Sequence, residues 1–178
     1  MKKVKLEELG RISVDEFKVV PKIPLCILLD NVRSLHNVGS AFRTADAFRV
    51  EKIFLCGITG KPPHREIQKT ALGATESVDW EYAESAVNTI QQLKLNGYTI
   101  IVIEQTTESI SLDTHNPTRA EKICLVFGNE VEGISEEVIA LADKAIEIPQ
   151  GGTKHSLNVA VCMGIVLWEF FQKLKDKA

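Results

Sequence analysis

The stretch ICLVFGNEVEGIS, residues 123–135, joins an unbroken apolar run to a loop whose polar part has a glycine at each end. A run that is apolar at every position is typical of a strand covered on both faces in a parallel sheet. Gly128 and Gly133 can adopt positive φ angles or let other backbone approach closely. The stretch therefore predicts a buried parallel strand followed by a loop with unusual backbone, although an ordinary glycine-flanked turn has the same pattern.

Similar apolar runs recur along the chain and alternate with helical patterns. Strands are predicted at Leu25–Leu29, Lys52–Cys56, Ser77–Glu81, Tyr98–Ile103, Ile123–Phe127 and Ala145–Ile148. Helices are predicted at Val38–Phe48, Glu84–Leu95, Glu136–Ala142 and from Ser156 to about Lys175. This alternation indicates an α/β fold with a mostly parallel sheet flanked by helices. We expect a single domain over residues 1–178, with a short extension at 1–22.

Composition limits the classes of function. The chain has 178 residues, 44% of them hydrophobic, which is enough for a sizeable core. Its apolar runs are too short for a membrane span, and the opening MKKVKLEELGRIS lacks the apolar core of a signal peptide. The net charge of −3 argues against a simple basic coat for nucleic acid. Two local basic clusters are either solvated surface or phosphate contacts: Lys2, Lys3 and Lys5, and Lys61, His64, Arg65 and Lys69.

The four cysteines are widely spaced, and each lies in an apolar run. No CxxC motif is present in the sequence, so we expect no zinc site. Buried, reduced thiols in a cytoplasmic protein are the favoured interpretation.

Ligands of parallel α/β sheets bind outside the carboxyl ends of the strands, so the loops after the strands are the places to look for chemistry. The segment LDNVRSLHNVGSAFRTADAF, residues 29–48, carries Asn37, Gly39 and Arg43 after the first strand. It lacks the GxxxxGK[ST] pattern of a phosphate-binding loop. Asn37 either caps the helix or belongs to a site, and Arg43 either pairs with Asp46 on the surface or acts on a ligand.

The segment EIPQGGTKHSLNVAVCMGIVLWEF, residues 147–170, leads from a strand through a glycine pair into a helix. That helix is apolar around nearly its whole circumference, so it must be buried on most sides, in part within a subunit interface. It opens with two polar side chains. Ser156 is either a helix cap or a site residue, and Asn158, expected inside the first turn, favours a site.

Taken together, these stretches resemble the three signature motifs of the SpoU (TrmH) family of RNA ribose 2′-O-methyltransferases. The matching segments are N-x-G-x-x-x-R from Asn37 to Arg43, LVFGNEVEGIS at 125–135 and IPQGGTKHSLNVAV at 148–161. KTALGATESVDW at 69–80 is also similar to a middle segment of the family. The resemblance covers roughly Ile23 to Phe171, and three motifs in order are far more specific than one.

The resemblance implies a fold, a cofactor and an assembly. It implies an α/β domain with its C-terminal segment tied in a deep trefoil knot, and a homodimer. It also implies S-adenosylmethionine bound in the knotted loops, mainly by backbone groups, so that the glycines of GNEVEGIS let the main chain close around the cofactor. We expect no metal, because the sequence has no His, Cys and carboxylate cluster at metal-ligand spacing. The implied cofactor-binding residues are Ile103, Glu104, Gly128, Ile148, Ser156 and Leu157.

The implied reaction is attack of a ribose 2′-hydroxyl of tRNA or rRNA on the sulfonium methyl group. Arg43 matches the family's catalytic arginine. Because a guanidinium stays protonated in proteins, we expect it to grip phosphate and stabilise the developing alkoxide rather than to act as a base. The other implied catalytic residues, which would hold the pocket and orient Arg43, are Asn37, Glu130, Ser156 and Asn158.

Two other classes of protein are alternatives. A non-catalytic RNA-binding or assembly protein could keep the same fold, but the intact set of implied catalytic residues argues against it. A nucleotide-dependent oxidoreductase is disfavoured because no GxGxxG follows the first strand.

Overall fold

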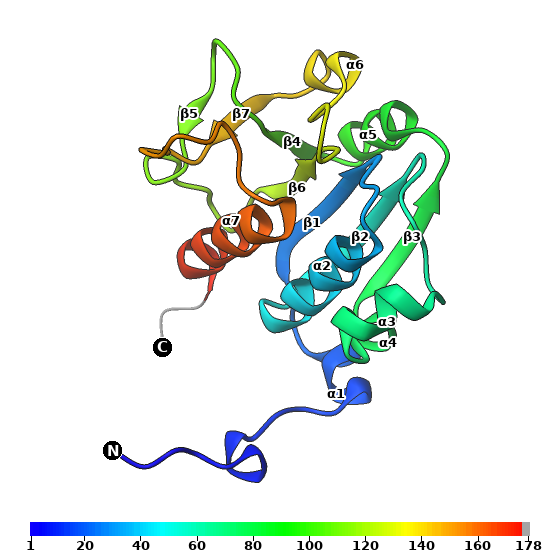
Figure 1. The fold of residues 1–178 in the computed structure, drawn as a ribbon, viewed down its shortest axis with the longest axis vertical. Helices are drawn as coiled ribbons and strands as arrows, with labels where there is room; N and C mark the ends of the chain where they lie inside the picture. The colour runs from blue at the N-terminus through cyan, green and yellow to red at the C-terminus, as the bar shows by residue number, and fades with distance from the viewer. Residues whose placement is uncertain (176–178) are drawn as a thin grey trace.

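The computed structural model describes residues 1–175, and its centre is one seven-stranded sheet in the order β3-β2-β1-β6-β4-β7-β5 (Figure 1). Every neighbouring pair of strands is parallel. The predicted α/β fold with a mostly parallel sheet is therefore confirmed. The strands are β1 (Ile23–Asp30), β2 (Val50–Cys56), β3 (Asp79–Ala83), β4 (Tyr98–Ile103), β5 (Ile110–Ser111), β6 (Lys122–Phe127) and β7 (Lys144–Glu147).

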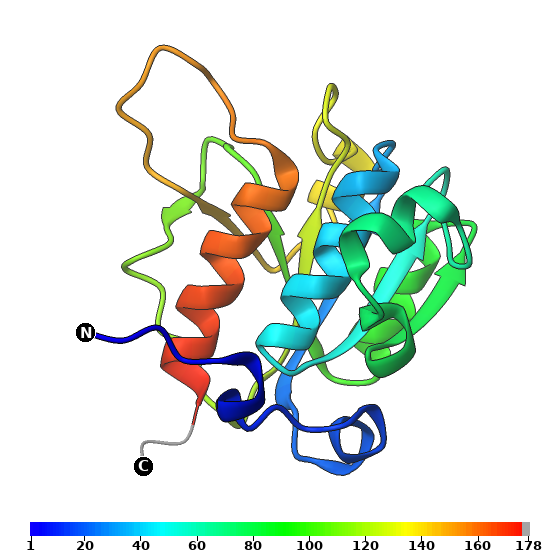
Figure 2. The same ribbon diagram turned by 60° about the horizontal axis from the view of Figure 1, so that its bottom comes forward.

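Helices cover both faces of this sheet (Figures 1 and 2). The helices of the described chain are the 3₁₀ helix η1 (Leu6–Leu9) and the α-helices α1 (Val14–Val19), α2 (Leu35–Ala47), α3 (Arg65–Ala71), α4 (Ala74–Ser77), α5 (Ala86–Leu95), α6 (Glu136–Ile139) and α7 (Val159–Leu174). α2, α3, α4 and α7 pack on one face, whereas α5 and α6 pack on the other. The sheet is thus the middle of three layers.

The central strand β1 is covered on both faces, which explains why its sequence does not alternate between apolar and polar residues. Leu25, Ile27 and Leu29 point to the core beneath α2 and α7, while Cys26 and Leu28 point to the core beneath α5. Successive side chains of a strand point to opposite faces, so a strand covered on both faces needs apolar residues throughout. All five side chains are buried accordingly.

Several element boundaries differ from the prediction. The strand predicted from Ser77 begins at Asp79, because Ser77 ends α4. The helix predicted from Val38 begins at Leu35, because the Ser34 side chain accepts a hydrogen bond from the Asn37 backbone at 3.3 Å and caps it. Of the two interpretations of Asn37, the helix cap is therefore excluded.

The last helix also starts later than predicted. Asn158, not Ser156, is its N-cap, and the Asn158 Oδ1 accepts from the backbone N–H groups of Ala160 and Val161 at 2.9 and 3.3 Å. A capping side chain satisfies backbone donors that have no partner within the helix. The residues before Asn158 are consequently free to form a loop over the end of the sheet.

Gly39 allows α2 and α3 to pack closely. A Cβ atom at this position would lie 2.1 Å from Thr70 Oγ1 and 2.3 Å from the Ile67 carbonyl oxygen. The two helices therefore approach until backbone meets backbone, which only glycine permits. This close packing holds the N-terminal half of α2 against α3.

The four cysteines are unpaired, as predicted; Cys26, Cys56 and Cys124 are buried and Cys162 is half-buried. Burial raises the pKa of Cys56 to about 11, so this thiol stays protonated at neutral pH. Within residues 1–175, no helix has the length and apolar character needed to cross a bilayer.

Candidate active site

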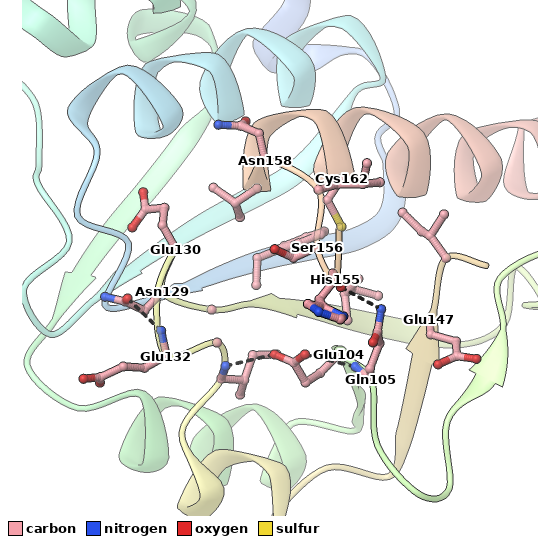
Figure 3. A pocket seen from close by; sticks show the side chains of 18 of the residues that line it. Glu104, Gln105, Asn129, Glu130, Glu132, Glu147, His155, Ser156, Asn158 and Cys162 are labelled. Carbon is pink, nitrogen blue, oxygen red and sulfur yellow. Dashed lines mark hydrogen bonds between the residues drawn. The ribbon is translucent and has the colours of Figure 1, made fainter. Parts of the chain in front are cut away.

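A pocket of about 600 Å³ lies beyond the carboxyl ends of β4, β6 and β7 (Figure 3). Its volume is within the range of small-molecule sites, and its place is where parallel α/β sheets bind ligands. The walls come from the loops after these three strands and from the start of α7. All the residues predicted to bind the cofactor line it: Ile103, Glu104, Gly128, Ile148, Ser156 and Leu157.

The loop after β6 is a tight turn closed by backbone hydrogen bonds. The Asn129 and Gly133 backbones exchange two hydrogen bonds of 2.9 and 3.0 Å. Inside the turn, Asn129 Oδ1 accepts from the backbone N–H groups of Val131 and Glu132 at 2.8 and 3.2 Å. The Asn129 amide also donates to the Asn31 carbonyl at 2.8 Å, which ties this loop to the loop after β1.

The glycines of this loop are required by contacts within the protein itself. A Cβ atom on Gly128 would lie 2.3 Å from the carbonyl carbon of Gly133. Gly133 has a φ of 71°, and a Cβ atom there would lie 2.4 Å from Glu104 Oε2. Residues with side chains fit neither position, so the glycines first fold the loop and thereby form one wall of the pocket.

The Glu104 side chain stabilises the pocket wall formed by the loop after β4. Its Oε2 accepts from the Ile134 backbone N–H at 3.2 Å, and its Oε1 accepts from the Gln105 backbone N–H at 3.0 Å. The Gln105 amide then donates to the His155 carbonyl at 3.2 Å. These bonds join the loops after β4, β6 and β7, as the dashed lines of Figure 3 show in part.

Three of the predicted catalytic residues form one hydrogen-bonded network. The Asn37 side-chain amide donates to Glu130 Oε1 at 2.9 Å, and the Asn158 amide donates to Asn37 Oδ1 at 3.3 Å. The Glu130 carboxylate also accepts from the backbone N–H groups of Arg33 and Ser34, each at 2.9 Å. One residue from each of the three sequence motifs is thus joined directly to the next.

The Glu130 carboxylate is held in its ionised form. Desolvation acts to raise its pKa, but the hydrogen bonds from Arg33, Asn37 and Ser34 outweigh it and lower the pKa below the ordinary value. A carboxylate that accepts three hydrogen bonds and is reluctant to take up a proton is a poor general base. Glu130 is instead placed to anchor the start of α2 to the pocket wall.

Ser156 and Arg43 lie outside this network. Ser156 lines the pocket, and its side chain has no hydrogen-bond partner among residues 1–175. Arg43 is exposed on α2 and does not line the pocket. Its expected surface partner, Asp46, accepts a hydrogen bond from the Ser77 hydroxyl instead, and no Arg43–Asp46 ion pair occurs in the described chain. The catalytic role of Arg43 stays a prediction.

Sequence reasoning missed several polar residues of the site. Gln105 and His155 line the pocket, and neither was expected there. Asp30, which lies beside the pocket lining, was also assigned no role, although it is buried and its Oδ2 accepts from the Ser135 hydroxyl at 3.0 Å. Its position directly after an apolar strand was the available signal, because a polar side chain there faces the ligand-binding edge of the sheet.

The pocket has a strongly negative lining. No lysine or arginine is among the described residues that form it, whereas four carboxylates are: Glu104, Glu130, Glu132 and Glu147. Apolar side chains such as Ile103, Ile146 and Ile148 supply much of the remaining wall. A ligand with a flat apolar part and a positive charge matches this lining, and S-adenosylmethionine has both.

Two further observations limit the chemistry. Burial raises the pKa of Cys162 at the pocket wall to about 11, so this thiol is a poor nucleophile at neutral pH. The described residues contain no group of three or more His, Cys, Asp or Glu side chains arranged to hold a metal ion.

Residues 24–168 match the family model of the SpoU rRNA methylase family. The chain belongs to the SpoU family. Among its relatives, the tRNA (guanosine(18)-2′-O)-methyltransferase of Aquifex aeolicus is 34% identical over 86% of this chain and 71% of the relative. The 23S rRNA (guanosine-2′-O-)-methyltransferase of Neisseria meningitidis serogroup B is 32% identical over 82% of this chain and 57% of the relative.

Solved structures agree with this assignment to the SpoU family. The TrmH/SpoU tRNA modifying enzyme of A. aeolicus superposes with a TM-score of 0.80 at 29% identity, over 90% of this chain and 80% of that chain. An AdoMet-bound rRNA methyltransferase of Sinorhizobium meliloti also has a TM-score of 0.80, at 26% identity, over 90% of this chain and 61% of that one. The chain thus spans less than two thirds of several relatives.

These findings confirm the predicted family and enzyme class. The protein is an RNA 2′-O-methyltransferase of the SpoU type that uses S-adenosylmethionine. The relatives named above differ in whether they act on tRNA or rRNA.

Proposed function

We propose that this SpoU-family protein methylates the ribose 2′-hydroxyl of one nucleotide in a structured tRNA or rRNA. The observation that carries the proposal is the pocket after β4, β6 and β7 together with its direct connection to the first motif. The pocket fits the methyl donor, and the network from Asn158 through Asn37 to Glu130 reaches from its wall to α2.

The pocket residues divide the work of holding S-adenosylmethionine. Ile103, Ile148 and Leu157 would pack against its apolar parts, and the backbone around Gly128 would follow its outline. The carboxylates of the lining would favour its positive charge. When bound, this donor supplies an electrophilic methyl group on a sulfonium sulfur.

The reaction needs alignment and charge stabilisation. The ribose 2′-oxygen would form a bond to the methyl carbon as the carbon–sulfur bond breaks, so that S-adenosylhomocysteine leaves and the 2′-hydroxyl proton passes to solvent water. Holding reactants in line contributes up to about 7–11 kcal/mol of barrier lowering in well-ordered cases. Asn37, Ser156 and Asn158 would fix the pocket, and the Arg43 guanidinium, which remains protonated, would grip phosphate and stabilise negative charge on the 2′-oxygen.

We also propose that the protein acts as a homodimer through α7. One side of α7 is buried in the core, but Val161, Ile165 and Trp168 are 53%, 40% and 51% exposed. Such a row of apolar side chains favours a protein partner. α7 begins at the pocket and packs beside α2, which carries Arg43. A second copy on this face would therefore bring the pocket and Arg43 into one interface.

A trefoil knot in the C-terminal segment is proposed on the family resemblance. The chain leaves β7 at the far side of the sheet and returns to pack α7 against β1 and α2. On the way, the 148–158 segment passes the loop after β4, where Gln105 bonds the His155 carbonyl. This crossing of loops is the place where we expect the chain to be threaded.

The activity is tested with purified protein, methyl-labelled S-adenosylmethionine, and two RNA pools, bulk tRNA and fragmented rRNA without prior 2′-O-methylation. Digestion to nucleosides and mass spectrometry should reveal one 2′-O-methylated nucleoside in one of the pools. Protein that binds the donor but methylates neither pool would contradict the proposal. Methyl groups on a base rather than a ribose would contradict it as well.

A further inference from the structure

The carboxyl edge of the sheet is divided by charge. Its β6-β4-β7 half carries the carboxylate-lined pocket described above. Its β2-β1 half carries basic side chains in the segments that follow these two strands: Arg33 after β1, and Lys61 and Arg65 after β2, together with the His64 imidazole, all exposed. These four residues are here called the basic surface.

The basic surface is a connected part of the fold. His36 Nε2 lies 2.9 Å from Glu66 Oε2, and the Thr70 hydroxyl donates to the His36 carbonyl at 3.0 Å, so the first turns of α2 and α3 are in contact. Arg33 precedes the first of these turns and Arg65 begins the second. The close approach at Gly39 fixes this arrangement.

The cations of the basic surface are not neutralised by the protein. Within residues 1–175, the side chains of Arg33, Lys61 and Arg65 form no ion pair with a carboxylate. Lys61 instead lies over the Tyr82 ring, with its Nζ 4.1 Å from the ring centroid. The carboxylate of Glu66, which follows Arg65 in the chain, already pairs with Lys69 Nζ at 2.7 Å and with His36 Nε2 at 2.9 Å.

This division of charge decides how a polyanion can approach. A phosphate backbone is repelled by the carboxylates of the pocket and attracted by unpaired arginines and lysines. The basic surface and the pocket are adjacent, because the Arg33 backbone N–H donates to Glu130 Oε2 at 2.9 Å. An RNA that holds one ribose at the pocket therefore meets unpaired cations for its neighbouring phosphates on the adjacent β2-β1 half.

We infer that the substrate RNA docks across the loops after β1 and β2, with its phosphates on Arg33, Lys61 and Arg65. This inference rests on the proposed function and adds the path of the RNA. The acidic half of the edge receives the cationic methyl donor, and the basic half receives the polyanion. The two substrates thus reach one reaction centre from different sides.

The test compares charge reversal with charge conservation. The charge reversals Lys61→Glu and Arg65→Glu are made singly and together. They are compared with one conservative double variant, the conservative pair, which combines Lys61→Arg and Arg65→Lys. A matched control on the opposite, amino edge of the sheet is Lys122→Glu, at the exposed start of β6. Binding of bulk tRNA and fragmented rRNA is measured at several salt concentrations, S-adenosylmethionine binding by calorimetry, and folding by thermal melting.

Each reversal should weaken RNA binding by roughly 10-fold near about 0.1 M salt and lower the slope of log affinity against log salt by about 1. The conservative pair and Lys122→Glu should bind RNA like the wild type, and every variant should keep its affinity for the methyl donor. Wild-type RNA binding that the folded double reversal retains would overturn the docking surface alone. A wild type that binds neither RNA pool at any salt would overturn the proposed function together with it.

Discussion

Asn37 is the residue at which the distant parts of the site meet. Its side chain accepts from Asn158 and donates to Glu130, residues that are 121 and 93 positions away in the chain. It is also buried, although it is polar. A buried amide is tolerated when its hydrogen bonds are satisfied, so Asn37 depends on both partners and both depend on it. The motif predicted that these residues belong together, but not which of them bonds to which.

The ionised state of Glu130 has a consequence for stability. Its pKa in the folded protein is lowered, so its contribution to stability is present above the unfolded value of about 4.3 and is lost as pH falls through the folded value. The melting temperature of Glu130→Gln should therefore be lower than that of the wild type at pH 6–7. The gap between the two melting temperatures should narrow below about pH 4. Melting curves against pH measure this, and Glu108→Gln, at an exposed loop position, should show no gap. A constant gap at all pH values would argue against an ionised anchor.

Arg43 is predicted to act in the chemical step and not in cofactor binding. It is exposed, it has no ion-pair partner among the described residues, and it lies outside the pocket. Arg43→Ala should keep S-adenosylmethionine affinity within a few-fold while methyl transfer falls by roughly 10²-fold, the scale for one lost transition-state donor. Arg43→Lys should restore little, because a point charge does not replace the planar guanidinium. Single-turnover rates decide this, and wild-type speed in folded Arg43→Ala would end the assignment.

At the scale of elements, the loop after β6 depends on two glycines that face each other. A methyl group on Gly128 would meet the Gly133 backbone, which cannot rotate away. Gly128→Ala should therefore cost about 1–3 kcal/mol of stability, as overpacking does, and should weaken S-adenosylmethionine binding at least roughly 10-fold. Gly151→Ala is the matched control, because a Cβ atom there meets nothing within 4 Å. Chemical denaturation and calorimetry measure both effects; equal behaviour of the two variants would contradict the steric argument.

The long elements could be predicted from the sequence, whereas several short ones, such as β5 and α3, could not. β1 and β6 are apolar throughout because both faces of the sheet are covered, and this pattern is visible without a structure. β5 has two residues and α3 has seven, too few for a periodic pattern to emerge. The start of α7 was misplaced because Ser156 and Asn158 are both good caps, and tertiary contact with Asn37 decides between them.

Much of the site prediction came from the family resemblance and could not have come from local patterns. The cofactor residues are spread over the loops after three strands, and only the strand order brings these loops together. Local reasoning correctly marked the glycines after β6, but it gave no hint that Glu104 is their neighbour. Contacts across the sheet depend on the order of the strands, and no single segment of the sequence determines that order.

At the scale of the whole molecule, the exposed side of α7 predicts self-association. Wild-type protein should sediment as a dimer at micromolar concentration, and Ile165→Glu and Trp168→Glu should each sediment as monomers, because a charge cannot be buried in an apolar interface without a partner. Leu95→Glu, at an 80% exposed position on α5, should remain dimeric. A monomeric wild type, or a dimer that both α7 variants retain, would contradict the proposed interface.

The knot can be tested by pulling on the chain from both ends. An untied, fully extended chain gains at most about 3.6 Å per residue between the attachment points. A knotted chain tightens under force and keeps several residues inside the knot, so its unfolded length should be measurably shorter. Optical-trap stretching gives this length directly, and a full-length extension would rule the knot out.

The central position of β1 has a consequence during synthesis of the protein. One edge of β1 is covered by β2 soon after it is made, but the other waits for β6, and the contact from Asn129 to Asn31 spans 98 residues. A ribosome that adds about 5–20 residues per second needs roughly 5–20 s for that distance. During this time a strongly apolar strand has an open edge in the cell, where it can pair with the wrong chain. Nascent copies of this protein should therefore depend on chaperones until β6 emerges, and slower translation of the segment between these strands should lower the yield of folded enzyme.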